Sequence, residues 1–158
     1  MPNMRFKSVL FAAILGVFGG MIGVNAQTVT GSIANGTVTR GKAARGTVVL
    51  TVPGGLHVNS SRPAAEYMIP TTVKISSASG VKLSAVTYPK GVDRKYEFSD
   101  KAVNTYEGRV SFPFTVTAGD TFRGREVVVT ATVNYQACTN EVCYAPKSKT
   151  VKIKARVE

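Results

Sequence analysis

Alternation of apolar and other residues is the feature that most constrains the fold of this 158-residue chain. Two segments show it most clearly: residues 110–116, with Val110, Phe112, Phe114 and Val116, and residues 151–157, with Val151, Ile153, Ala155 and Val157. A period of two places such residues on one face of a strand, where they are buried against a second layer. Both segments are therefore predicted to be half-buried β-strands, and Pro113 indicates a sheet edge or a bulge.

Four further segments have the composition of strands: residues 47–52, 72–76, 81–88 and 126–135. They are rich in Val, Thr and Tyr, and turn residues such as those of Pro53–Gly55 separate them. No segment shows a convincing helical stripe. About seven short strands at this spacing predict an all-β protein, an immunoglobulin-like antiparallel β-sandwich. For residues 27–45 the sequence leaves open an added hairpin or a loose arm.

The first 26 residues have the pattern of a secretory signal peptide. Arg5 and Lys7 precede an apolar run, which ends in the small-x-small sequence Val24-Asn25-Ala26. We expect residues 27–158 to form a single domain that is not inserted in a membrane after cleavage of the leader. Its expected location, the periplasm or outside the cell, lets disulfides form and persist.

The chain has a formal net charge of +11, and the leader contains two of its basic residues, so residues 27–158 carry +9. A charge of this sign favours acidic partners. The basic residues are dispersed, however, and in residues 151–157 they alternate with apolar ones. This pattern is typical of the solvated outer face of a strand, and no nucleic-acid partner is expected.

Two cysteines, Cys138 and Cys143, lie in the sequence YQACTNEVCYAP at residues 135–146. Cys138 follows one predicted strand and Cys143 precedes another, so the two flank the turn of a hairpin. Opposed strand positions have Cβ atoms about 4.5–5.5 Å apart, which makes a disulfide feasible. Across so short a loop it would stabilise the fold by only about 2 kcal/mol in the chain-entropy model. Redox use and a structural clamp both remain open.

Other chemistry is poorly supported. The spacing of the cysteines differs from the C-x-x-C of thioredoxin, and no helix is expected after Cys143. Only His57 adds another imidazole or thiol donor, so no metal site is predicted. No motif of a hydrolase or of a nucleotide-binding loop occurs.

The cysteine segment, continued by Lys149-Thr150-Val151, resembles the cysteine hairpin of one family: the N-terminal periplasmic domain of DsbD-type thiol:disulfide interchange proteins, also described as disulfide bond corrector-like. Further pieces resemble this domain in the same order: Gly55-Leu-His-Val-Asn59, Ile69-Pro-Thr71, Tyr88-Pro-Lys-Gly91, Tyr96-Glu-Phe98 and Tyr106-Glu-Gly108. The resemblance covers roughly residues 46–157.

This resemblance implies an immunoglobulin-like domain that passes reducing equivalents by thiol-disulfide exchange, as a protein-disulfide reductase relay without a bound cofactor. The implied partners are a membrane-embedded electron donor and thioredoxin-like periplasmic proteins. In the family the second cysteine forms the mixed disulfide and the first resolves it, roles that fall on Cys143 and Cys138. Because no electron conduit or thioredoxin-like domain precedes Glu158, we expect a stand-alone form with a separate donor protein.

The resemblance also implies which residues surround the cysteines. A loop phenylalanine that caps them matches Phe98, and the acid beside it matches Glu97, whereas a second acid common in the family is replaced by Tyr96. Aromatic positions near the cysteines fall on His57 and Asn59.

Each surrounding residue also has a plainer interpretation. Taken alone, Phe98 is a core residue, and His57 is an outward, solvent-facing residue of a strand rather than a neighbour of the disulfide. Tyr135 and Tyr144 are predicted to pack as cross-strand neighbours beside the cysteines. The alternative function is a secreted β-sandwich for binding or assembly, in which the disulfide is purely structural.

Overall fold

The computed structural model describes residues 26–64 and 67–158; the predicted signal peptide lies outside them except for its last residue, Ala26. The described residues form twelve β-strands and no helix. The strands are β1 Thr28–Ile33, β2 Thr37–Val38, β3 Ala44–Thr51, β4 His57–Asn59, β5 Thr72–Ser76, β6 Val81–Leu83, β7 Val92–Arg94, β8 Val103–Tyr106, β9 Arg109–Ala118, β10 Glu126–Tyr135, β11 Ala137–Cys138 and β12 Lys147–Val157.

The strands form three four-stranded sheets, in the orders β1-β3-β9-β6, β2-β12-β10-β5 and β11-β4-β8-β7. The first two enclose the main core, which takes Leu50 and Phe112 from one sheet and Val129 and Ile153 from the other. Neighbouring strands are antiparallel, except that β2 runs parallel to β12. The predicted all-β, immunoglobulin-like sandwich is confirmed.

The alternating pattern of the sequence becomes the alternating burial of the long strands. In β9 the four predicted residues, Val110, Phe112, Phe114 and Val116, are all buried. In β12 Ile153 and Ala155 are buried, with the flanking valines half-buried. Each strand therefore presents one apolar row to the core and a polar row, rich in lysine on β12, to solvent.

Pro113 lies in an interior strand, because β9 is placed between β3 and β6. However, β6 pairs only with residues 116–118 of β9. At Pro113 the carbonyl instead accepts a hydrogen bond from the N–H of Thr87, 2.9 Å away in an irregular segment. A proline lacks a donor for a sheet ladder, and here it occurs where regular pairing on that side has already ended.

The segment left open in the sequence, residues 27–45, belongs to both main sheets. β1 pairs along its whole length with β3, and β2 pairs with the end of β12. It is neither a separate hairpin nor a loose arm.

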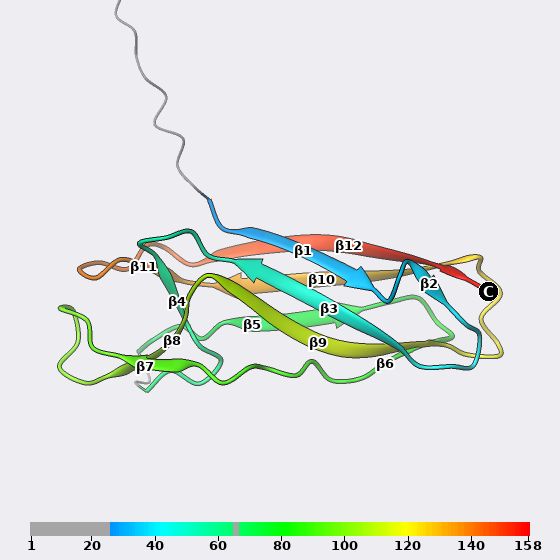
Figure 1. Ribbon diagram of the computed structural model, residues 1–158, viewed down its shortest axis with the longest axis horizontal. Coiled ribbons are helices and arrows are strands. Elements are labelled where there is room, and N and C mark those ends of the chain that lie inside the picture. The colour runs from blue at the N-terminus through cyan, green and yellow to red at the C-terminus, as the bar shows by residue number, and fades with distance from the viewer. Residues whose placement is uncertain (1–25, 65–66) are drawn as a thin grey trace, which may run out of the picture.

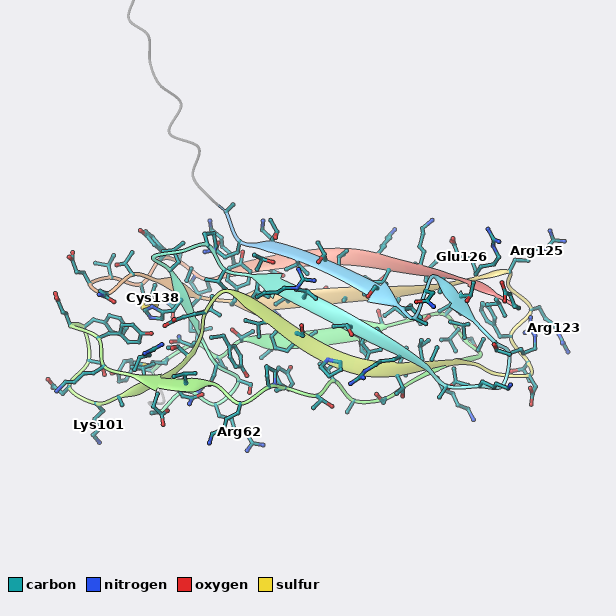
Figure 2. The ribbon with its side chains drawn as sticks, in the orientation of Figure 1. Arg62, Lys101, Arg123, Arg125, Glu126 and Cys138 are labelled. Carbon is teal, nitrogen blue, oxygen red and sulfur yellow. A yellow bond between two sulfur atoms is a disulfide. The ribbon has the colours of Figure 1, made fainter. Side chains whose placement is uncertain are left out.

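The third sheet lies at the end of the molecule away from the C-terminus (Figure 1). Figure 2 shows Cys138 near this end, whereas Arg123, Arg125 and Glu126 lie at the opposite end. The main sandwich thus carries the cysteine segment at one extremity. Within the described ranges no helix has the length and apolar character needed to cross a membrane.

Candidate functional site

A disulfide joins Cys138 and Cys143 at the predicted hairpin. The S–S distance is 1.99 Å and the Cα atoms are 4.0 Å apart, and the two residues also form an antiparallel bridge. Between them the backbone N–H of Thr139 donates to the carbonyl of Val142 at 2.8 Å. Just outside, the N–H of Tyr144 donates to the carbonyl of Ala137, also at 2.8 Å. The disulfide therefore closes a compact, hydrogen-bonded turn.

The two cysteines differ sharply in exposure. Cys138 is fully buried, with an exposed fraction of 0%, because β11 pairs with β4 at this end of the molecule. Cys143, by contrast, is exposed. It lies between two exposed apolar residues, Val142 at 52% and Tyr144 at 49%. An approaching molecule can thus reach Cys143 more easily than Cys138.

Tyr135 and Tyr144 are not cross-strand neighbours, contrary to the sequence prediction. The register of β10 and β12 places Tyr135 opposite Lys147, three residues beyond Tyr144. The side chain of Tyr135 is fully buried in the main core, where burial raises the pKa of its hydroxyl. That hydroxyl has no hydrogen-bond partner among the described residues. The two tyrosines differ because β12 begins only at Lys147, so Tyr144 precedes the paired region.

The position of His57 between Leu56 and Val58 suggested a residue that faces solvent, but in the structure it does not. Its side chain is only 3% exposed. The register of β4 and β11 places His57 directly opposite Cys138. The ring of Tyr96 stacks on the imidazole with centroids 3.8 Å apart and covers it. The imidazole is therefore a neighbour of the buried cysteine.

Tyr96 and Phe98, which lie in the loop between β7 and β8, form an aromatic cluster with His57. The rings of His57 and Tyr96 are stacked with centroids 3.8 Å apart, and those of Tyr96 and Phe98 with centroids 5.3 Å apart. The rings of His57 and Phe98 are 6.0 Å apart. The three planes are within 16° of parallel. The loop is thus attached to β4 through its aromatic residues.

The same loop is attached to the cysteine turn through its backbone. The N–H of Glu97 donates to the carbonyl of Asn140 at 3.1 Å. Asn140 lies inside the loop that the disulfide closes. The side chain of Glu97 is exposed. The loop carrying Phe98 therefore lies against the cysteine turn, as a cap would.

Phe98 itself is half-buried rather than part of the main core. It packs against a small second cluster of buried residues, Met68, Tyr96 and Val103. Its surroundings are therefore separate from the sandwich interior. The role of Phe98 as a cap over the sulfur atoms stays a prediction.

Hydrogen bonds fix the hydroxyl of Tyr96 in place. Its hydroxyl shares a hydrogen bond of 3.0 Å with the hydroxyl of Thr105, and it donates to Oε1 of Glu107 at 3.3 Å. Arg94 forms an exposed ion pair with Glu107 at 3.5 Å. Burial raises the pKa of the Tyr96 hydroxyl, so it remains a donor near neutral pH. Where the family commonly has an acid, this chain thus has a neutral, fixed aromatic ring.

Several residues that hold the site together were not singled out from the sequence. Glu107 and Asn140 make the contacts described above, and Gln136 links two others. The amide oxygen of Gln136 accepts a hydrogen bond of 3.4 Å from Nδ2 of Asn59, and its Nε2 donates to the carbonyl of Tyr144 at 3.1 Å. Glu107 and Gln136 both lie in the segments that carry the family resemblance, which was the only available signal for them.

A cavity of about 500 Å³ adjoins the turn. Its lining includes His57, Tyr96, Glu107, Asn140 and Glu141. No group of three or more His, Cys, Asp or Glu side chains placed to hold a metal ion occurs in the part of the chain that the structure describes. The reactive group that the site offers is the disulfide, which can exchange with thiols.

Solved structures similar to this one have low sequence identity. The N-terminal domain of DsbD from Neisseria meningitidis, in the reduced form, is 18% identical over 70% of this chain and 77% of its own, with a TM-score of 0.46. The N-terminal periplasmic domain of ScsB from Proteus mirabilis is 11% identical over 80% of this chain and 44% of its own, with a TM-score of 0.48. The GAE domain of GGA2p from Saccharomyces cerevisiae is 13% identical over 80% and 88%, with a TM-score of 0.43.

No curated protein matches the sequence. The sequence model of one family does, over residues 29–155: "Thiol:disulfide interchange protein DsbD, N-terminal". This match covers most of the chain and includes both cysteines, the loop with Phe98 and the strand with His57. The all-β fold and the disulfide between Cys138 and Cys143 agree with it. The chain belongs to the family of DsbD N-terminal domains.

Proposed function

We propose that this protein is a periplasmic thiol-disulfide exchange module that passes reducing equivalents between redox partner proteins through Cys138 and Cys143. The observation that carries the proposal is the unequal exposure of the two cysteines: Cys138 is buried and Cys143 is exposed. Disulfide exchange proceeds through a mixed disulfide, so one sulfur must meet the partner. Cys143 has the exposure that this role requires.

The chemistry follows from that inequality. In the oxidised protein, a thiolate of the electron donor attacks Sγ of Cys143, and the bond to Cys138 breaks. A second donor thiol then releases reduced Cys143, which leaves a dithiol on this protein and a disulfide on the donor. In the opposite half-reaction the thiolate of Cys143 attacks an acceptor disulfide, and Cys138 resolves the mixed disulfide. Two electrons and two protons pass to the acceptor.

The exposed residues around Cys143 suit a protein partner. Val142 and Tyr144 flank the cysteine, and Ile69 is also exposed. The carbonyl of Ile69 accepts a hydrogen bond of 3.0 Å from Asn59, and Asn59 is joined through Gln136 to Tyr144. Exposed apolar groups that lie together mark contact surfaces. The proposed partners are thioredoxin-like proteins and a membrane-embedded donor, as the family resemblance implies.

A trapping experiment in the native periplasm tests the proposal. In the variant Cys138→Ala the resolving thiol is missing, so mixed disulfides between Cys143 and partner proteins should accumulate. They should disappear on treatment with dithiothreitol. The matched variant Cys143→Ala keeps the buried cysteine and should form none. If neither variant yields a mixed disulfide with any protein, the exchange function is wrong.

The reduction potential separates this function from a purely structural disulfide. A structural disulfide of a secreted protein has a potential below about −300 mV, whereas exchange-competent pairs lie higher. Equilibration of the wild-type protein with glutathione or dithiothreitol buffers measures it. A value above that limit is expected; a lower one favours the alternative, a binding or assembly module with a structural clamp.

A further inference from the structure

A buried histidine lies opposite the buried cysteine. His57 on β4 and Cys138 on β11 are directly paired in the antiparallel register. Residues paired in this way project from the same face of the sheet, with Cβ atoms about 4.5–5.5 Å apart. Both side chains are almost completely buried. The imidazole of His57 and the sulfur of Cys138 are therefore neighbours in a region that water does not reach freely.

One nitrogen of this histidine has no partner. Nε2 of His57 is buried and makes no hydrogen bond to any of the residues described. Such orphaned groups are rare in folded proteins, because burial without a partner costs free energy. In the disulfide form Cys138 has no S–H group to offer. Reduction creates one opposite His57, and a thiol is a donor that an imidazole nitrogen can accept.

Burial favours the neutral form of His57 over the effect of the charged groups around it. Tyr96 stacks on its ring and is itself a neutral donor. Glu107, which is paired with Arg94, and Glu141 of the cysteine turn face it across the cavity. Burial lowers the pKa of His57 below its ordinary value, against the weaker opposing effect of Glu107. A neutral imidazole has a free lone pair and can act as a base.

We propose that His57 accepts the proton of the Cys138 thiol when Cys138 resolves the mixed disulfide. The inference rests on the proposed exchange function and adds the residue that activates the buried thiol. The sulfur of Cys138 forms a bond to Sγ of Cys143, and the bond from Cys143 to the partner sulfur breaks. The partner leaves with the electron pair as a thiolate. The proton passes to His57 and from there, through the adjoining cavity, to the departing thiolate or to water.

A buried cysteine needs a neighbouring base to accept its thiol proton more than an exposed cysteine does. Removal from water raises the pKa of a thiol, because it penalises the charged thiolate. Cys143 is exposed and can form its thiolate in water, whereas Cys138 cannot do so as easily. General bases contribute factors of about 10² to 10⁴ to reactions of this type. His57 supplies a base to the one cysteine of the two that lacks solvent.

A two-phase reaction tests the proposal. The reduced protein is mixed with 5,5′-dithiobis(2-nitrobenzoate) in a stopped-flow instrument. Attack by Cys143 releases the first thionitrobenzoate, and resolution by Cys138 releases the second. Three proteins are compared from pH 5 to pH 9: wild type, His57→Phe and Val58→Ala. His57→Phe keeps an aromatic ring for stacking but has no base, whereas Val58→Ala disturbs the same strand and leaves the imidazole in place.

The expected change is confined to the second phase. At pH 6–7 His57→Phe should slow this phase at least about tenfold, and its rate should then rise with pH until it approaches that of wild type near pH 9, where hydroxide deprotonates the thiol. The first phase should change little. Val58→Ala should keep the pH profile of wild type. Circular dichroism confirms that each variant is folded; if His57→Phe is not, His57→Gln takes its place.

Two results would overturn the inference: an unchanged second phase in the His57 variant, or a loss of rate that is equal at every pH, which indicates a structural role. Failure of the exchange function looks different. In that case wild type itself shows no second phase, and its mixed disulfide with thionitrobenzoate persists. If the wild type resolves its mixed disulfide normally and the His57 variant has the same pH profile, only the role of His57 is wrong, and the exchange function stands.

Discussion

Three nearly parallel rings connect the loop between β7 and β8 with the buried end of the disulfide. Tyr96 is stacked on both His57 and Phe98, and His57 is opposite Cys138. The rings therefore extend from the half-buried Phe98 to the residue that is paired with Cys138. In this chain Tyr96 replaces an acid that the family resemblance implies at this position. Its ring is the surface on which His57 stacks. Aromatic pairs of this kind contribute about 0.5–1.5 kcal/mol beyond the area they bury.

Replacing Phe98 by Ala should speed the reaction of the reduced protein with a small disulfide reagent. The loop that carries Phe98 lies against the cysteine turn, so removal of the ring opens access to the sulfur atoms. Because Phe98 is half-buried and lies outside the main core, the free energy of unfolding should fall by less than the 3–5 kcal/mol typical of a core phenylalanine. Stopped-flow kinetics and urea unfolding measure the two effects.

Phe122 provides the matched control for this change. It is buried in the main core, in the segment between β9 and β10, and Figure 2 shows Arg123 and Arg125 of this segment at the end opposite Cys138. Phe122→Ala should lower stability and leave the rate of thiol reaction unchanged. If Phe98→Ala behaves in the same way, Phe98 is a core residue and the prediction of a cap is wrong.

At this scale the sequence predicted the cysteines and their hairpin but not the surroundings of each sulfur. The turn is local, so a few residues of sequence determine it. The burial of His57 and the stacking of Tyr96 on it depend on contacts across some forty positions, which no local pattern encodes. The resemblance named both residues, yet only the structure shows which of them touch. The predicted pairing of Tyr135 with Tyr144 was wrong for a related reason. The strand that faces Tyr135 begins three residues after Tyr144, at Lys147.

Among the elements, strands with one face in the core were predicted best. Residues 72–76 and 126–135 form β5 and β10 with the predicted bounds. The segment 81–88 was only partly predicted, because β6 ends at Leu83. Beyond it the hydroxyl of Tyr88 accepts a hydrogen bond of 2.7 Å from the backbone N–H of Val73 in the other main sheet. After Leu83 the chain therefore bonds to both main sheets, because Thr87 still donates to Pro113 of β9, and the composition of the segment could not reveal this arrangement.

Two attachments hold the loop between β7 and β8, and only one depends on the redox state. The aromatic stack does not involve the disulfide. The hydrogen bond from Glu97 to Asn140, by contrast, ends inside the turn that the disulfide closes. Reduction should therefore weaken the backbone attachment while the rings keep the loop in place. The loop of the reduced form would then lift more readily when a partner arrives.

Hydrogen exchange measures this difference. The amide of Glu97 should exchange faster in the reduced protein than in the oxidised one, because its acceptor carbonyl becomes mobile. Amides of residues 130–134 are the control, since β10 is paired on both sides there and lies apart from the turn. Their exchange should be equal in the two forms. Equal exchange at Glu97 as well would show that the loop does not respond to the disulfide.

Across the whole molecule, the disulfide lies at one end of the stabilising core, to which the third sheet contributes Val58, Tyr106 and Ala137. The main core draws on the long strands β3, β9, β10 and β12. The third sheet adds a smaller cluster around Val103 next to the cysteine turn. The long strands also carry charge on their solvent side, because Lys152 and Lys154 of β12 lie on the outer face of the sandwich. Because most core residues lie in the long strands, we expect the fold to survive reduction of the disulfide.

The double variant Cys138→Ala/Cys143→Ala should accordingly remain folded at room temperature. The disulfide closes a loop with a sequence separation of only five residues, for which the chain-entropy model gives about 2 kcal/mol. Typical domains have 5–15 kcal/mol of stability, so a folded majority should survive. Far-ultraviolet circular dichroism should show an unchanged β-rich spectrum, and urea unfolding a midpoint shifted to lower concentration.

Wild-type protein kept reduced is the control, since it lacks the bond but retains both side chains. A double variant that is unfolded while the reduced wild type is folded points to the packing of Cys138 rather than to its bond. If both are unfolded, the disulfide is the structural clamp of the alternative function.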